Sequence, residues 1–140
     1  MKYIVTGGAG FIGSNLVDLL IKEGHDVHVI DNFSSGKKEN CNEQAKYFEL
    51  DISDHSNFED LKNILIGSNG VFHLAALPRV QESIDNPLQF EKNNTLSTIN
   101  ILKACVDTNV KRLVYSASSS AYGNTDKIGR AHVWTPVTRS

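Results

Sequence analysis

The chain has few of the residues that several classes of protein require. Its 140 residues include only two cysteines, Cys41 and Cys105, which lie far apart in the sequence. Two distant cysteines suggest neither the disulfide framework of a small secreted protein nor a metal site. The five histidines show no ligand spacing either. We therefore expect no bound metal.

Strong charge and long apolar segments are also missing. The 14 Lys+Arg and 16 Asp+Glu residues leave a formal net charge of -2, and the basic residues form no cluster. This balance gives no electrostatic footprint for nucleic acid or for an anionic membrane. No apolar run approaches the ~20 residues of a membrane helix, and Met1 leads into an apolar strand rather than a signal segment. We therefore expect a cytoplasmic protein without nucleic-acid or membrane partners.

The most informative segment is a glycine-rich turn between an expected strand at residues 3–5 and an expected helix from Phe11 to about Gly24. Residues 6–13 read Thr-Gly-Gly-Ala-Gly-Phe-Ile-Gly. In such a turn Gly7 allows the tight bend, Gly10 lets the backbone approach a pyrophosphate, and Gly13 lets the helix lie close to the strand. The unpaired N–H groups at the start of the helix would bind the phosphates.

An acidic residue completes this pattern. The apolar strand expected at residues 27–30 leads directly to Asp31. A carboxylate at this position accepts hydrogen bonds from ribose hydroxyls and repels a 2′-phosphate. The joint pattern predicts a site for the adenosine half of NAD rather than NADP. A glycine loop in an unrelated α/β protein is the alternative, and the joint pattern disfavours it.

Strands and helices alternate along the rest of the chain. We expect further strands at residues 47–50, 70–74 and 112–116, and helices at residues 56–65 and 87–108. This alternation predicts an α/β, Rossmann-like, doubly wound parallel sheet with strand order 3-2-1-4-5. Apolar spacing predicts the core faces of the first and last helices, formed by Ile12, Leu16, Leu19 and Leu20 and by Leu88, Ile99, Leu102 and Val106.

With the strand ends in view, the chain resembles the extended short-chain dehydrogenase/reductase family, the NAD-dependent epimerase/dehydratase group that acts on nucleotide sugars. The matching segments are residues 6–13, 31–32, 51–52 and 73–76, Asn94, and residues 118–123. The resemblance implies a homodimer in the full-length protein, with residues 87–108 as a candidate interface. It also implies that Phe11 and Ile12 contact the pyrophosphate of NAD, that Asp31 and Asn32 contact the adenosine ribose, and that Asp51 and Ile52 contact the adenine. Leu74, Ala75 and Ala76 would contact the middle of the cofactor, and Asn94 would lie near the nicotinamide-side ribose.

A run of three serines bears on the reaction. In the family, the residue four positions before a Tyr-Gly pair bonds the sugar hydroxyl that is oxidised, which implies a catalytic role for Ser118. Ser119 and Ser120 stand where sugar dehydratases of the group have an Asp-Glu pair. Elimination of water needs a general acid and base that serines cannot supply. The resemblance therefore favours a 4-epimerase acting on a UDP-hexose. A sugar dehydratase or decarboxylase and a non-catalytic NAD-binding module are the alternatives.

The family's catalytic Tyr-x-x-x-Lys pair does not occur in this sequence. We therefore expect residues 1–126 to be an incomplete NAD-binding domain, truncated before its sixth strand and inactive alone. Residues 127–138 back-translate to a common sequencing adapter, with Trp134 on a TGA codon. We expect residues 127–140 to be a non-native tail, and a natural loop is the alternative.

Overall fold

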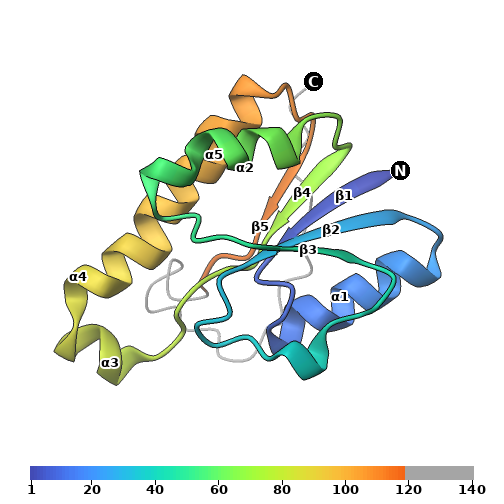
Figure 1. The fold of residues 1–140 in the computed structure, drawn as a ribbon. Coiled ribbons are helices and arrows are strands. Elements are labelled where there is room, and N and C mark those ends of the chain that lie inside the picture. The colour runs from blue at the N-terminus through green and yellow to red at the C-terminus, as the bar shows by residue number, and fades with distance from the viewer. Residues whose placement is uncertain (119–140) are drawn as a thin grey trace, which may run out of the picture.

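The structure is a computed structural model that describes residues 1–118 (Figure 1). The expected tail at residues 127–140 and the serines at positions 119 and 120 lie outside the described residues. Strands and helices alternate in the order β1 (Lys2–Thr6), α1 (Phe11–Lys22), β2 (Asp26–Asp31), η1 (Lys38–Asn40), β3 (Lys46–Glu49), η2 (His55–Asn57), α2 (Phe58–Leu65), β4 (Gly70–His73), α3 (Val80–Asp85), α4 (Pro87–Phe90), η3 (Glu91–Leu96), α5 (Ser97–Asp107) and β5 (Leu113–Tyr115).

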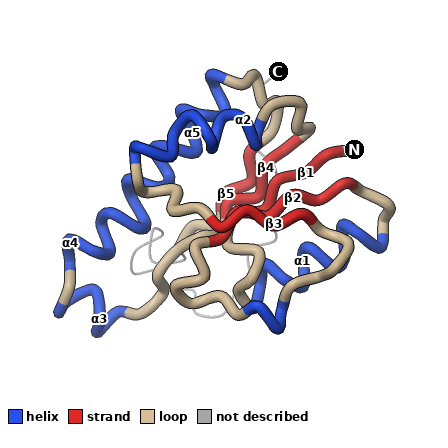
Figure 2. Tube along the Cα trace, in the orientation of Figure 1, coloured by secondary structure: helices blue, strands red, loops and turns tan. Residues whose placement is uncertain are grey.

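The five strands form one parallel sheet in the order β3-β2-β1-β4-β5. The strand order and the α/β class predicted from the sequence are confirmed. Thr6 of β1 is paired in register with Ile30 of β2 and with His73 of β4. The carboxyl ends of these three strands therefore meet at one edge of the sheet, and Figure 2 shows their loops leaving that edge together.

Helices cover both faces of the sheet, and each face has its own core. Helix α1 lies on one face, whereas α2 and α5 lie on the other (Figure 1). Because successive residues of a strand point to opposite faces, Ile4 packs in the core under α2 and α5 while Val5 packs in the core under α1. None of the helices within residues 1–118 is long and apolar enough to cross a membrane.

The expected core face of α1 is partly wrong. Leu20 is buried as expected, but Ile12 and Leu19 are 66% and 54% exposed. The buried stripe consists of Gly13, Val17 and Leu20. Gly13 sets this rotation of the helix, because it must face the turn at Gly7 and Gly8 at a distance that only a residue without a side chain allows. The spacing of apolar residues alone does not reveal this steric requirement at Gly13.

The expected single helix at residues 87–108 is three consecutive segments. A short α4 leads through the π-helical η3 into α5. A π turn holds more residues than an α turn, so it changes which side chains face the sheet. The helix α3 before α4 was not predicted.

The expected core face of this long segment is wrong. Leu88 and Val106 are 80% and 75% exposed, and Ile99 and Leu102 are exposed as well. The residues of α5 that face the sheet are Ser97, Asn100, Ile101, Ala104 and Cys105. Two of these are polar: Ser97 donates to the carbonyl of Asn93 one turn earlier, whereas Asn100 donates to the carbonyl of Ile52 in the loop after β3. Hydrogen bonding therefore contributes to the orientation of α5, which apolar periodicity could not predict.

Paired substitutions on α5 test this orientation. Ile101 is 0% exposed and Ile99 is 54% exposed on the same helix. We expect Ile101→Ala to lower the free energy of unfolding by about 3 kcal/mol, because it leaves a cavity in the core. Ile99→Ala should change it by about 0.5 kcal/mol or less. Urea denaturation of both variants measures the difference, and equal losses would contradict the orientation.

Candidate cofactor-binding site

The glycine turn after β1 has a geometry that excludes side chains at two positions. Gly7 has φ +72°, and a Cβ atom there would lie 2.8 Å from the backbone nitrogen of Ala75. A Cβ atom on Gly13 would lie 2.1 Å from the carbonyl oxygen of Gly7. Both distances are far below van der Waals contact. The two glycines therefore bring α1 and the end of β4 against the same turn.

The start of α1 is open to an anion. Gly10 is the N-cap residue and makes no side-chain cap, and the first turn contains no acidic residue. Phe11 and Ile12 occupy the first two helical positions, with their side chains exposed. Amides at a helix start that no side chain caps can bind a phosphate group. The predicted pyrophosphate contacts lie at this point.

Asp31 connects β2 to the glycine turn. Its Oδ2 accepts a hydrogen bond of 2.9 Å from the backbone N–H of Ala9, and its Oδ1 accepts one of 2.8 Å from the N–H of Phe33. The residue is buried. An ionised carboxylate offers about four acceptor positions, so the two bonds leave capacity for ribose hydroxyls. The sequence did not reveal that Asp31 also holds the turn in place. Asn32 caps the same loop, because its Oδ1 accepts from the N–H of Ser34 at 3.0 Å.

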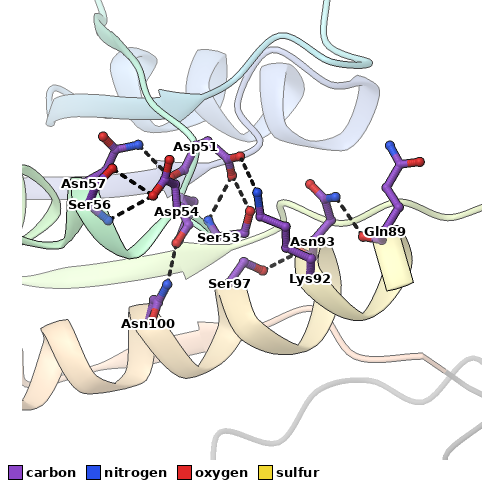
Figure 3. Close-up of polar contacts among 11 residues, drawn as sticks. Asp51, Ser53, Asp54, Ser56, Asn57, Gln89, Lys92, Asn93, Ser97 and Asn100 are labelled. Atoms are coloured by element: carbon purple, nitrogen blue, oxygen red, sulfur yellow. Dashed lines mark hydrogen bonds and ion pairs between the residues drawn. The ribbon is translucent and has the colours of Figure 1, made fainter. Parts of the chain in front are cut away.

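Polar contacts join the loop after β3 to η3 and α5 (Figure 3). Asp51 Oδ1 accepts from the N–H of Ser53 at 2.9 Å and from its hydroxyl at 2.6 Å, while Lys92 Nζ lies 3.7 Å from Oδ2. The carbonyl of Ile52 accepts a hydrogen bond of 2.8 Å from the buried Nδ2 of Asn100. Asn100 of α5 thus holds Ile52, and Lys92 of η3 lies beside Asp51, the two residues expected to contact adenine.

The loop after β4 is held by Asn94. The N–H of Leu77 donates to Asn94 Oδ1 at 2.8 Å, and Asn94 Nδ2 donates to the carbonyl of Leu77 at 3.1 Å. This side chain was expected near the nicotinamide-side ribose, a role that stays a prediction. The structure shows that it positions the loop, whereas the neighbouring Asn93 lines the cavity.

These segments surround a cavity at the carboxyl edge of the sheet. Predicted and additional residues form its lining. The predicted ones are Gly7, Gly10, Asp31, Asn32, Asp51, Ile52, Leu74, Ala75 and Ala76. The additional ones are Ile30, Ser34, Ser35, Gly36, Leu50, Ser53, Leu77, Asn93 and Ser97.

Three further predicted positions, Gly13, Phe11 and Ile12, belong to α1 beside the turn. Ser118 follows β5, which pairs with β4. Among the residues that sequence reasoning missed, 34–36 carry a signal. Small residues follow the position expected to bind the ribose, and a Cβ atom on Gly36 would lie 2.8 Å from Cβ of Ala9.

A parallel sheet of this order, a glycine turn at a helix start and a carboxylate after the second strand define the class of dinucleotide-binding α/β domains. The model of the NAD dependent epimerase/dehydratase family matches residues 3–139. The chain belongs to this NAD-dependent family.

Several known proteins are similar to the chain. A UDP-glucose 4-epimerase of Lactobacillus helveticus is 40% identical over 129 residues, which are 91% of this chain and 38% of that protein. The solved UDP-glucose 4-epimerase of Thermotoga maritima with UDP-glucose has a TM-score of 0.83 at 40% identity, covering 91% of this chain and 41% of that one.

A UDP-glucose 4-epimerase of Thermus thermophilus in complex with NAD has a TM-score of 0.84 at 34% identity, covering 97% of this chain and 44% of that one. The chain therefore spans well under half the length of these relatives.

Beneath the cavity, His73 makes the fold sensitive to acid. It is 1% exposed, and burial lowers its pKa from 6.5 to about 4. The unfolded chain therefore binds this proton at a higher pH than the folded chain does. The neutral, buried His73 therefore contributes fully to the unfolding free energy above pH 6.5. This contribution, which amounts to about 3 kcal/mol at most, is lost as the pH falls towards 4.

We expect His73→Asn to flatten the dependence of the unfolding free energy on pH between 6.5 and 4, because asparagine does not titrate. Denaturant titrations at several pH values measure the slope. His55, which is exposed, provides the control, and His55→Gln should keep the wild-type slope. A His73→Asn variant with the wild-type slope would show that another group causes the acid sensitivity.

Proposed function

We propose that this chain is the NAD-binding part of a UDP-sugar 4-epimerase, an enzyme that inverts C4 of a UDP-hexose through a 4-keto intermediate. The observation that carries the proposal is the cradle formed by Gly7, Gly13 and Asp31. Two of its positions have no room for a side chain, and the third places a buried carboxylate after β2. The relatives named as UDP-glucose 4-epimerases support the choice of reaction.

The residues around the cavity fit a dinucleotide. When bound, NAD supplies an acceptor for the hydride from C4 and returns it. The first-turn amides at Phe11 and Ile12 would hold the pyrophosphate at the positive end of the α1 dipole. Asp31 would accept from the ribose hydroxyls, and its negative charge would disfavour a 2′-phosphate.

The remaining predicted residues complete the assignment. Asp51, with Ile52, would accept from the adenine amino group. The small residues Ala75 and Ala76 leave room for the middle of the cofactor beside the backbone.

The sugar end of the proposed reaction involves Ser118. A hydroxyl at this position would bond the C4 hydroxyl of the sugar and hold its proton in line for transfer to a general base. The family's Tyr-x-x-x-Lys base is not in this sequence. We therefore propose that the 140-residue chain binds NAD but does not catalyse epimerisation by itself.

We also propose that the full-length protein is a homodimer that uses the apolar face of α4 and α5. Leu88, Ile99, Leu102 and Val106 are exposed along this segment. Apolar side chains repeated along one exposed helical segment are characteristic of a contact surface. Each would be covered if two copies packed through this face.

Cofactor preference tests the role of Asp31. We expect the chain to bind NAD in isothermal titration calorimetry and to bind NADP at least tenfold more weakly. Asp31→Asn should weaken NAD binding about tenfold, the equivalent of about 1.4 kcal/mol, and should strengthen NADP binding, because the repulsive charge is gone.

The control for Asp31→Asn is Asp26→Asn, at the other end of the same strand, which should leave both affinities unchanged. A substitution that only damaged the loop would weaken the binding of NAD and of NADP together. Equal loss of NAD and NADP binding would therefore count against ribose recognition by Asp31.

The reaction is tested in the full-length protein with UDP-glucose as substrate. We expect UDP-galactose as the product. Ser118→Ala should lower kcat about 100-fold, on the scale of positioned proton transfer, and Ser118→Thr should restore much of it. Release of a 4-keto-6-deoxy sugar, the product of water loss across C5 and C6, would favour the dehydratase alternative instead. Absence of any turnover in a protein that binds NAD tightly would favour a binding module.

A further inference from the structure

Thr6 is the meeting point of three groups under the cavity. Its Oγ1 accepts hydrogen bonds of 3.2 Å from the N–H groups of both Leu74 and Ala75, and it lies 2.7 Å from Nδ1 of His73. A hydroxyl oxygen has two acceptor lone pairs and one proton to donate. The N–H of Leu74 is shared with the backbone carbonyl of Thr6, also at 3.2 Å. With both amides directed at Oγ1, the proton of Thr6 points to His73. Nδ1 is therefore an acceptor and carries no proton.

The other side of the imidazole has a matching arrangement. Nε2 of His73 lies 3.1 Å from Oγ1 of Thr98, and that hydroxyl donates to the carbonyl of Asn94 at 2.6 Å. Since the proton of Thr98 is used on a carbonyl, its oxygen accepts from His73. Nε2 therefore carries the proton.

The contacts close into a ring around one cavity wall. Residues 74 and 75 are held by Thr6, and Leu77 is held by the side chain of Asn94. The backbone carbonyl of Asn94 leads through Thr98 to His73 and back to Thr6. The imidazole connects Thr6 to Thr98 in this ring.

We propose that His73, as the neutral Nε2–H tautomer, is a positioning residue that fixes residues 74–77 against the cofactor. The imidazole accepts a hydrogen bond at Nδ1 and donates one at Nε2, and no other tautomer satisfies both hydroxyls at once. Its burial and its stacking against Tyr115, with ring centroids 5.6 Å apart, hold the ring plane in place. The role of His73 rests on the proposed NAD site, whereas the tautomer does not.

The tautomer is tested by long-range ¹H–¹⁵N correlation spectra of the ¹⁵N-labelled chain at pH 7. We expect His73 to show a pyridine-type shift at Nδ1 and a pyrrole-type shift at Nε2. The reverse pattern would overturn the proposal. In Thr6→Val the hydrogen bond to Nδ1 is lost, so the Nδ1 signal should move, while Nε2 should keep its proton because Thr98 still accepts from it. An unchanged Nδ1 shift in Thr6→Val would also overturn the proposal.

The positioning role is tested by NAD titration of Thr98 variants. Thr98→Val should weaken NAD binding about fivefold and shift the His73 nitrogen signals, while Thr98→Ser should restore both. The matched control is Thr108→Val at the C-cap of the same helix, because Thr108 makes the same kind of bond, from Oγ1 to the carbonyl of Ala104 at 2.7 Å. This control should change neither the affinity nor the signals of His73.

Each outcome has a distinct meaning. Unchanged NAD affinity in Thr98→Val, or equal losses in Thr98→Val and Thr108→Val, would overturn the positioning role. A wild-type chain that does not bind NAD would overturn the proposed function and the positioning role together. The nitrogen shifts of His73 would still decide the tautomer in that case, so the two failures can be told apart.

Discussion

The close approach of Gly13 to the carbonyl of Gly7 is the constraint on which the rest of the structure depends. It fixes both the separation of α1 from β1 and the rotation of α1, so that Val17 and Leu20 reach the core. It also aims the start of the helix at the carboxyl edge of the sheet. Core packing on one face and anion binding at the edge therefore follow from one steric requirement.

The order of the strands could be predicted from the sequence, because buried parallel strands are short apolar runs and right-handed crossovers leave few topologies. The faces of the helices could not be predicted as well. In α1 a steric contact determines the rotation. In α5 the hydrogen bond from Asn100 to Ile52 contributes to it. Both interactions involve residues that a hydrophobic pattern treats as neutral or as exposed.

The residues of the site likewise differ in whether the sequence predicts their roles. The glycine turn and Asp31 could be identified, because a backbone without room for Cβ and a carboxylate after the second strand are specific residue requirements. The distinction between Asn93 and Asn94 could not. Their directions depend on the π-helical η3, which has no signature in the composition of residues 91–96. Likewise, the hydrogen bonds of Thr6 and Thr98 to His73 join residues that are remote in sequence.

The π turn of η3 contains one residue more than an α turn. Deleting one residue between positions 91 and 96 would allow a continuous α-helix through this segment. The wider turn that now directs Asn94 to the loop and leaves Asn93 in the cavity lining would then be lost. The number of residues in this one turn therefore determines that, of two adjacent asparagines, one contacts the loop and the other lines the cavity.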